Sequence, residues 1–323
     1  MSQLLFNITL IQFLADHRNI ILAKFFLIAS FVGDVNGYIL VTTLIYVMWN
    51  KRLAIRLSVL LLLTMSLNHV LKIIIMNPRP FISEGTFLQK WAVSAESAKE
   101  LAMEYSTPSG HAMAASAFYP YLYAFVKNRY IRVVAVLAII LIGLSRPYLG
   151  VHYLEDILLG WAIGLSVALV AIKYSEQIST VWNKLSNWQQ VGIVVVASAT
   201  IFLFTMVING WRIDGQTRAF LSYAGFLTGI VIARPLELRT VNFDPRSSNA
   251  VAKILRYILS VAMVILTLLL LNKAFGAIAD KFSMLGYLLQ YVRYTVAGIV
   301  SIYLAPLVFT KIRLAKTKPI GVD

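Results

Sequence analysis

The sequence contains no cysteine, and only 13% of its 323 residues are charged. The absence of thiols excludes disulfides, cysteine-ligated metal and thiolate catalysis. Acidic residues are the scarcer charges, with 14 Asp and Glu against 29 Lys and Arg. Soluble domains carry charge on about a quarter of their residues. A chain this poor in charge, with 59% hydrophobic residues and a mean hydropathy of +0.76, falls outside that class.

Long apolar runs instead follow one another along almost the whole chain. They lie at 20–33, 35–49, 54–75, 110–126, 131–146, 154–173, 190–209, 217–233, 254–272 and 288–310. About 20 apolar residues cross a bilayer as a helix, and crossings must be helical because loops cannot lie in hydrocarbon. The sequence predicts an all-α, polytopic membrane helical bundle with ten crossings. Gly33-Asp34 interrupts the first two runs, so one interrupted span, giving nine crossings, is the alternative.

The positive charge gathers in alternate connections between the runs. More than half of the Lys and Arg residues lie around 51–56, 127–132, 173–184 and 234–256 and in the tail after 310. Cytoplasmic loops carry such an excess, so we expect these connections in the cytoplasm, most simply at a bacterial inner membrane. The cations form short clusters without a continuous basic face, which argues against nucleic acid as a partner.

Three short polar stretches stand at the ends of apolar runs. They are Lys72…Arg79-Pro80, Pro108-Ser109-Gly110-His111 and Ser145-Arg146…His152…Asp156. Charges there are costly in a membrane protein unless they have a function. Together the stretches supply cations, two imidazoles and a carboxylate, which suits binding a phosphate and breaking its ester bond through a histidine nucleophile. The predicted orientation places all three on the non-cytoplasmic face.

The third stretch holds a histidine and a carboxylate four residues apart. On a helix, His152 and Asp156 would share one face about one turn apart. The carboxylate could then fix the imidazole tautomer and leave the other nitrogen as a nucleophile. Pro147 and Gly150 predict a turn after Arg146 that brings its guanidinium back toward the histidine. A planar guanidinium can bind two phosphate oxygens at once.

The first stretch marks the end of a span. Lys72 closes the apolar run, and Pro78 and Pro80 terminate the helix and extend the backbone around Arg79. Two cations therefore lie close to one membrane boundary.

The second stretch opens the following span. Pro108 suits a helix start, Ser109 suits its N-cap, and Gly110 allows close approach to the backbone. The N–H groups at such a helix N-terminus form an anion site. His111, one residue later, can reach a leaving-group oxygen as a general acid.

Together the three stretches resemble the signature of the type 2 phosphatidic acid phosphatase superfamily, which reads Lys-x6-Arg-Pro, Pro-Ser-Gly-His and Ser-Arg-x5-His-x3-Asp. Their order and gaps match at every signature position. The resemblance covers about residues 18–174 and implies a six-helix phosphatase core. We therefore expect an N-terminal interfacial segment over 1–17, this core, and a transmembrane extension over 175–323 with about four additional helices.

The resemblance also implies roles for the motif residues. His152 would form a phosphohistidine, Asp156 would orient it, and His111 would protonate the departing oxygen. The phosphoryl oxygens would be held by Lys72, Arg79, Ser109, the Gly110 amide and Arg146. Neither a metal nor another cofactor is expected, because these cations supply the neutralising charge.

The resemblance leaves the substrate open. The leading expectation is a lipid phosphate or diphosphate, such as a polyprenyl diphosphate or a phosphatidic acid-type lipid. Alternatives are a soluble phosphate monoester, as in the related glucose-6-phosphatase, and phosphoryl transfer to another lipid. A homo-oligomer also stays open. In the loop over 78–107, a short amphipathic helix within 95–105 is predicted to lie over the site, either as a solvated face or as a selectivity lid.

Overall fold

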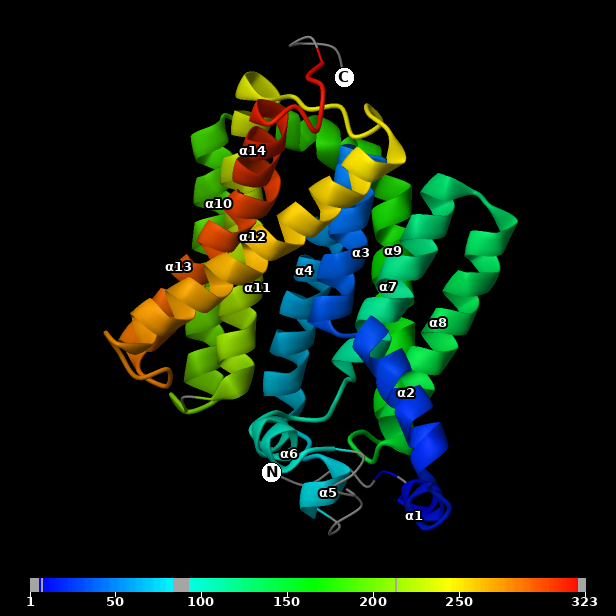
Figure 1. Ribbon diagram of the computed structural model, residues 1–323. Helices are drawn as coiled ribbons and strands as arrows, with labels where there is room; N and C mark the ends of the chain where they lie inside the picture. Colours follow the sequence, from blue (N-terminus) through cyan, green and yellow to red (C-terminus); the bar gives the residue numbers. More distant parts are fainter. Residues whose placement is uncertain (1–5, 7, 84–92, 213, 319–323) are drawn as a thin grey trace. The chain divides into compact units, whose positions relative to one another are not determined.

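The computed structural model describes residues 6, 8–83, 93–212 and 214–318. Its helices are α1 (Thr9–Asp16), α2 (Ile20–Val32), α3 (Val35–Met48), α4 (Lys51–Ile75), α5 (Pro80–Ser83), α6 (Ala95–Ala102), α7 (Gly110–Val126), α8 (Arg129–Tyr148), α9 (Leu154–Lys184), α10 (Asn187–Ile208), α11 (Gly215–Thr240), α12 (Ala250–Gly276), α13 (Met284–Ile299) and α14 (Ala305–Lys311) (Figure 1). A π-helical stretch, Val300–Leu304, separates the last two. Within the described ranges, the β-structure consists of an isolated antiparallel bridge between Phe243 and Thr317. The all-α expectation is confirmed.

In the part of the chain that the structure describes, seven helices are long and apolar enough to cross a membrane, and the number is eight if α2 and α3 count as one span. These two helices meet at an angle of 54°. Helix α7, with 17 residues, lies at the short end of what crosses a bilayer. Counting it gives nine crossings, which is the alternative expectation rather than the ten preferred from the sequence. The break falls at Gly33, where a Cβ atom would collide with Ile142 of α8.

The chain divides into two compact units. The first comprises Met1–Tyr38, Leu63–Ser175 and Thr205–Thr217, and the second comprises Ile39–Leu62, Glu176–Phe204 and Arg218–Asp323. Several long helices, including α4 and α9, contribute residues to both. These units are defined by spatial contacts, and each combines segments from different parts of the sequence. They therefore do not test the expected division into 1–17, 18–174 and 175–323, which stays a prediction.

In the first unit, α7 is the buried element. Most of its residues are inaccessible, and α8 packs beside it. On α9, Gly160 and Gly164 let the backbones approach closely, since a Cβ on Gly160 would lie 2.8 Å from the Ser109 carbonyl oxygen. The Ser109 N–H donates to the Asp156 carbonyl at 3.0 Å. The N-termini of α7 and α9 therefore meet, which brings the second and third motifs together.

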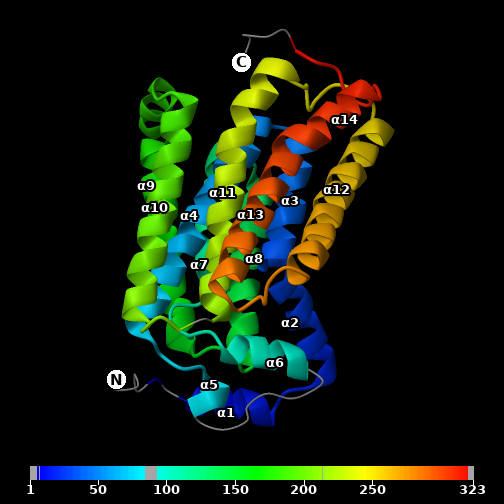
Figure 2. The same cartoon turned by 90° about the vertical axis from the view of Figure 1, so that its left-hand side faces the viewer.

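The short helices α1, α5 and α6 lie at one end of this unit (Figure 2). Helix α6 falls inside the segment for which a short amphipathic helix is predicted, so that helix is confirmed. Residues 84–92 of the same expected loop lie outside the described residues.

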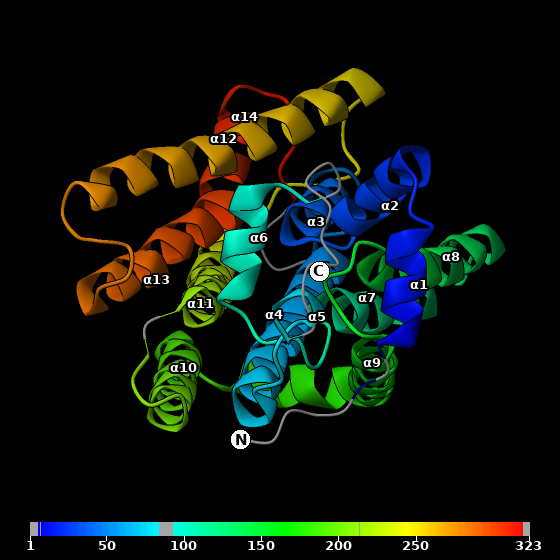
Figure 3. The same cartoon turned by 90° about the horizontal axis from the view of Figure 1, so that it is seen from below.

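In the second unit, α12 and α13 run side by side (Figure 3). Helix α13 also packs closely on α11, where a Cβ on Gly298 would lie 2.8 Å from the Phe226 carbonyl oxygen. Fully buried Arg256 of α12 donates to the Ser247 carbonyl at 2.8 Å. The segment between α11 and α12 is thus fixed by hydrogen bonds.

Candidate active site

The structure places all three motifs in the first unit and at neighbouring helix ends. Lys72 lies near the end of α4, Arg79 immediately precedes α5, and Ser109 and Gly110 begin α7. Arg146 lies near the end of α8, and His152 and Asp156 flank the start of α9. Apart from His111, which is partly exposed, these motif residues are buried: Lys72, Arg79, Ser109, Gly110, Arg146, His152 and Asp156.

His152 and Asp156 form the pair expected from their spacing, but not on a shared helix face. The imidazole Nδ1 lies 3.2 Å from the Asp156 Oδ2 atom. Because α9 begins only at Leu154, His152 lies in the preceding bend, so the expectation of a common helix is wrong. The pair forms because the Asp156 carboxylate, in the first helical turn, reaches back and accepts the Tyr153 N–H at 2.9 Å.

Two hydroxyl groups that the motif analysis did not single out hold this carboxylate. Thr107 donates to the Asp156 Oδ1 atom at 2.5 Å, and Ser106 donates to the Oδ2 atom. The Ser106 Oγ atom also lies 3.2 Å from the His152 Nδ1 atom. Asp156 is completely buried, so these donors replace the water that would otherwise solvate its charge. Their position directly before the Pro-Ser-Gly-His motif is the sequence signal that could have identified them.

The second nitrogen of His152 faces a cation. Arg79 Nη1 lies 3.0 Å from His152 Nε2. Arg79 Nη1 also donates to the Val151 carbonyl at 3.0 Å. Burial, followed by the charge of Arg79, lowers the pKa of His152 well below its ordinary value. The imidazole is therefore neutral at neutral pH, and its Nε2 atom lies beside a guanidinium that can hold an anion.

A carboxylate from outside the motifs bridges the first two cations. Glu104, just after α6, accepts from Arg79 Nη2 at 3.0 Å and from Lys72 Nζ at 3.4 Å through its Oε2 atom. Its side chain remains 30% exposed, whereas those of the two cations are 2% and 6% exposed. Burial alone would raise the pKa of Glu104, but the charges of Lys72 and Arg79 lower it below its ordinary value. Glu104 is thus an ionised partner of the cationic pair.

Two further motif residues present buried donors toward this region. Ser109 precedes α7 at the N-cap position, but its side chain does not cap the helix. Its Oγ atom and the Arg146 Nε atom are buried without a hydrogen-bond partner among the residues that the structure describes. The turn expected over Arg146–Val151 is present but begins later than predicted, because α8 continues through Pro147 to Tyr148 and the turn follows at Leu149 and Gly150. Arg146 instead reaches sideways, donating to Ser30 of α2 at 2.5 Å.

His111 lies in the first turn of α7 and near a carboxylate in the break between α2 and α3. Its Nε2 atom is 3.9 Å from the Asp34 Oδ2 atom. The charges of Arg146 and Arg79 act on both His111 and His152, so the two histidines belong to one electrostatic cluster. The sequence had indicated Asp34 only as an interruption of an apolar run.

The described part of the chain holds no group of three or more His, Asp or Glu side chains placed to bind a metal ion. What the first unit does hold is a buried His–Asp pair and a second histidine within a shell of cations and unpaired donors. The fold is that of a helical membrane protein, and the side chains in this cluster are of the types that bind an anion and carry out acid–base and nucleophilic chemistry.

Comparison with known families agrees with this class. Residues 53–179 match the PAP2 superfamily, and residues 221–317 match the PAP2 superfamily phosphatase transmembrane extension. The chain belongs to the PAP2 superfamily, the type 2 phosphatidic acid phosphatases, as the three motifs predicted. It is an integral membrane protein.

Individual relatives cover smaller parts of the chain. Phosphatidylglycerophosphatase B of Bacillus subtilis (strain 168) is 35% identical over 83 residues, which are 23% of this chain and 41% of the relative. The chain thus matches less than half the length of this relative. The crystal structure of Aquifex aeolicus LpxE aligns with 52% of this chain and 95% of its own, at 22% identity and a TM-score of 0.43.

Proposed function

We propose that this protein is an integral membrane phosphatase that hydrolyses a lipid phosphate or diphosphate through a phosphohistidine intermediate, without a metal ion. The observation that carries the proposal is the His152–Asp156 pair, in which the imidazole Nε2 atom lies 3.0 Å from Arg79 Nη1. A neutral, oriented imidazole beside a buried guanidinium suits attack on a bound phosphoryl group.

The proposed reaction has two steps. His152 Nε2 attacks phosphorus and forms a P–N bond, the P–O bond to the lipid breaks, and the leaving oxygen takes a proton from His111. Water then attacks phosphorus while His111 accepts its proton, the P–N bond breaks, and inorganic phosphate leaves with the His152 imidazole restored.

The phosphoryl oxygens would be held by the donors that converge on this site. Lys72 and Arg79 supply two charges, and Arg146 and the Ser109 hydroxyl supply donors that are otherwise unpaired among the described residues. The amide of Gly110, the first residue of α7, adds a further donor, because the first N–H groups of a helix have no partner within the helix. These charges take the part that metal ions have in other phosphoryl-transfer enzymes.

A lipid substrate follows from the position of the site at the ends of membrane-spanning helices. A headgroup can enter there while its chains stay in the bilayer. The similarity to phosphatidylglycerophosphatase B supports the same substrate class. Access from the non-cytoplasmic leaflet of a bacterial inner membrane, inferred from the loop charges, belongs to this proposal.

The proposal is tested by phosphate release from purified protein in detergent with excess EDTA. Phosphatidylglycerophosphate, phosphatidic acid and a polyprenyl diphosphate are compared with glucose 6-phosphate. We expect release from at least one lipid, changed by less than about twofold by EDTA, because protein cations supply the charge. Loss of activity in EDTA that added metal restores would contradict the metal-independent mechanism, and a preference for the soluble ester would contradict the lipid substrate.

Removing the charge of Glu104 is predicted to improve substrate binding. Since its carboxylate occupies the Lys72–Arg79 pair, a phosphate dianion must displace it. Glu104→Gln is therefore expected to lower KM about threefold to tenfold, with kcat changed by less than about twofold. Initial rates of phosphate release over a range of lipid concentrations in mixed micelles measure both constants.

The matched control is Asp16→Asn, which removes an exposed carboxylate at the end of α1 in the same unit. It should leave KM unchanged. A higher KM in Glu104→Gln would mean that the carboxylate positions the two cations for phosphate rather than competing with it.

A further inference from the structure

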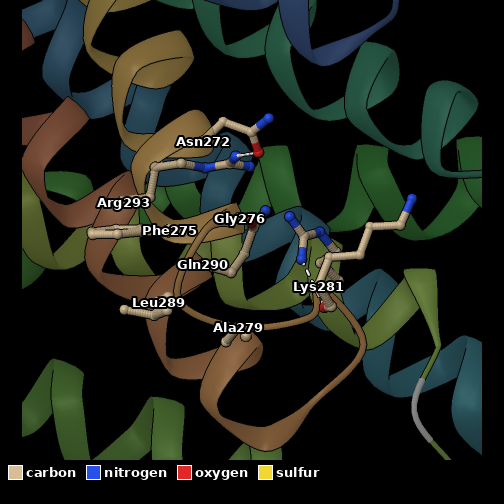
Figure 4. A pocket seen from close by; sticks show the side chains of 10 residues that line it. Asn272, Phe275, Gly276, Ala279, Lys281, Leu289, Gln290 and Arg293 are labelled. Atoms are coloured by element: carbon tan, nitrogen blue, oxygen red, sulfur yellow. Dashed lines mark hydrogen bonds between the residues drawn. The ribbon is translucent and has the colours of Figure 1, made fainter.

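A second cationic cluster, which contains none of the motif residues, lies in the second unit. A cleft in the second unit is lined by Arg218 near the start of α11, Lys281 between α12 and α13, and Arg293 on α13. Asn272, Phe275 and Gln290 complete its polar and apolar walls (Figure 4). The chemistry at the histidine pair does not require any of these residues.

The part of the chain that the structure describes places more cations than carboxylates around this cleft. Among the described residues, no ion pair joins Arg218, Lys281 or Arg293 to an acidic side chain. Arg218 Nη1 donates to the Lys281 carbonyl at 2.8 Å. The nearby Asp280 carboxylate accepts the Phe282 N–H at 2.7 Å, within its own turn. The cleft therefore keeps an excess of positive charge.

The Arg293 guanidinium has a nitrogen that can donate a further hydrogen bond. Its Nη1 atom donates to the Asn272 Oδ1 atom, as Figure 4 shows, while its Nε atom is buried without a hydrogen-bond partner in the described part of the chain. A buried, unpaired guanidinium nitrogen carries an energetic cost that an anion would remove.

The position of Arg293 points to a ligand from the bilayer. The residue lies nine positions after Met284 at the start of α13, about 13 Å along the helix axis. Cations at such depth in a spanning helix mark functional sites. Leu289 of α13 lines the cleft, and apolar side chains are exposed on the same two helices, including Leu269 on α12 and Leu285 and Leu288 on α13. These side chains could contact acyl chains while the cations contact a headgroup.

We propose that this cleft binds the phosphate group of an anionic phospholipid, with Arg218 and Arg293 contacting the phosphate oxygens and Lys281 adding charge from the loop. Basic pockets between transmembrane helices suit such headgroups. The site is a binding site and not a second catalytic centre, because its lining contains no histidine or carboxylate. It is independent of the proposed phosphatase activity.

The test titrates the purified full-length protein in detergent with three probes and follows its thermal unfolding. The probes are phosphatidylglycerol, which is an anionic phosphodiester, zwitterionic phosphatidylcholine, and inorganic phosphate. A ligand that binds the folded state raises the melting temperature with its concentration, which gives an apparent Kd. We expect stabilisation by phosphatidylglycerol, with an apparent Kd at least about tenfold weaker in Arg293→Gln.

Three further variants complete the design. Arg218→Gln should weaken phosphatidylglycerol binding as Arg293→Gln does. Lys281→Gln removes an exposed loop charge and should weaken it severalfold, which keeps the proposal testable if an arginine variant does not fold. The matched control, Lys273→Gln, removes an exposed cation at the same end of α12 that does not line the cleft, and should change Kd less than about twofold.

Any phosphatidylglycerol bound at the histidine site contributes equally to the wild type and to these variants, so their difference reports the cleft. Equal stabilisation by phosphatidylcholine, or an unchanged Kd in both Arg293→Gln and Lys281→Gln, would overturn the proposal. Stabilisation by inorganic phosphate alone, with the same dependence on Arg293, would assign the cleft to free phosphate and overturn the lipid ligand.

Discussion

Replacing His152 with Asn is expected to lower kcat/KM for a lipid phosphate at least about 10⁴-fold, because the variant has no nitrogen that can form the phosphoryl bond. The Asn side chain keeps a polar group near Arg79 and Asp156, so these two residues retain a hydrogen-bonding neighbour. Phosphate release measured over hours at high enzyme concentration sets the residual rate. Thermal unfolding in the same detergent checks that the variant is folded.

The intermediate itself can be trapped. Lipid labelled in its terminal phosphate should transfer label to the wild-type protein on rapid quenching in alkali, and acid should release it, as expected for a phosphoramidate. His152→Asn should carry no label, because it lacks the nitrogen that forms the P–N bond.

The control for the nucleophile is His17→Asn, which replaces an exposed histidine at the end of α1. It should retain full activity and labelling. Activity in His152→Asn within about tenfold of the wild type would refute the phosphohistidine mechanism while leaving the family assignment intact.

The sequence predicted much of this arrangement because the physics behind it is local. Apolar runs define spanning helices without reference to tertiary contacts, and each expected run corresponds to a helix. The 288–310 run is divided by the π-helical stretch at Val300–Leu304. Motif order and gaps also predicted that Arg79 and His152 would share a site, and their 3.0 Å contact is found.

What the sequence could not show depends on long-range geometry. Glu104 and Asp34 are ordinary loop charges by composition, and only the fold brings one to Lys72 and the other to His111. The same holds for Arg146, whose hydrogen bond to Ser30 joins α8 to α2. The prediction that His152 and Asp156 share a helix face was wrong because their spacing is typical of a helix but does not show where the helix begins.

Asp156→Asn is expected to have the next largest effect, a loss of about 10³- to 10⁴-fold in kcat. The carboxylate receives hydrogen bonds from Thr107 and the Tyr153 N–H and faces the His152 Nδ1 atom. A carboxamide can direct an N–H group at the imidazole, which then presents its protonated nitrogen to phosphorus. Nucleophilicity is lost although the ring stays in place.

Asp156 acts through His152 and does not contact the phosphate. Its replacement should therefore lower kcat and leave KM nearly unchanged. KM, and the Kd for orthovanadate as a phosphate analogue, should stay within about threefold of the wild type, since Lys72 and Arg79 are untouched. Glu155→Gln, one residue earlier in the first turn of α9, is the matched control and should retain kcat. A parallel loss of vanadate binding in Asp156→Asn would instead indicate collapse of the pocket, and an unchanged kcat would remove Asp156 from the mechanism.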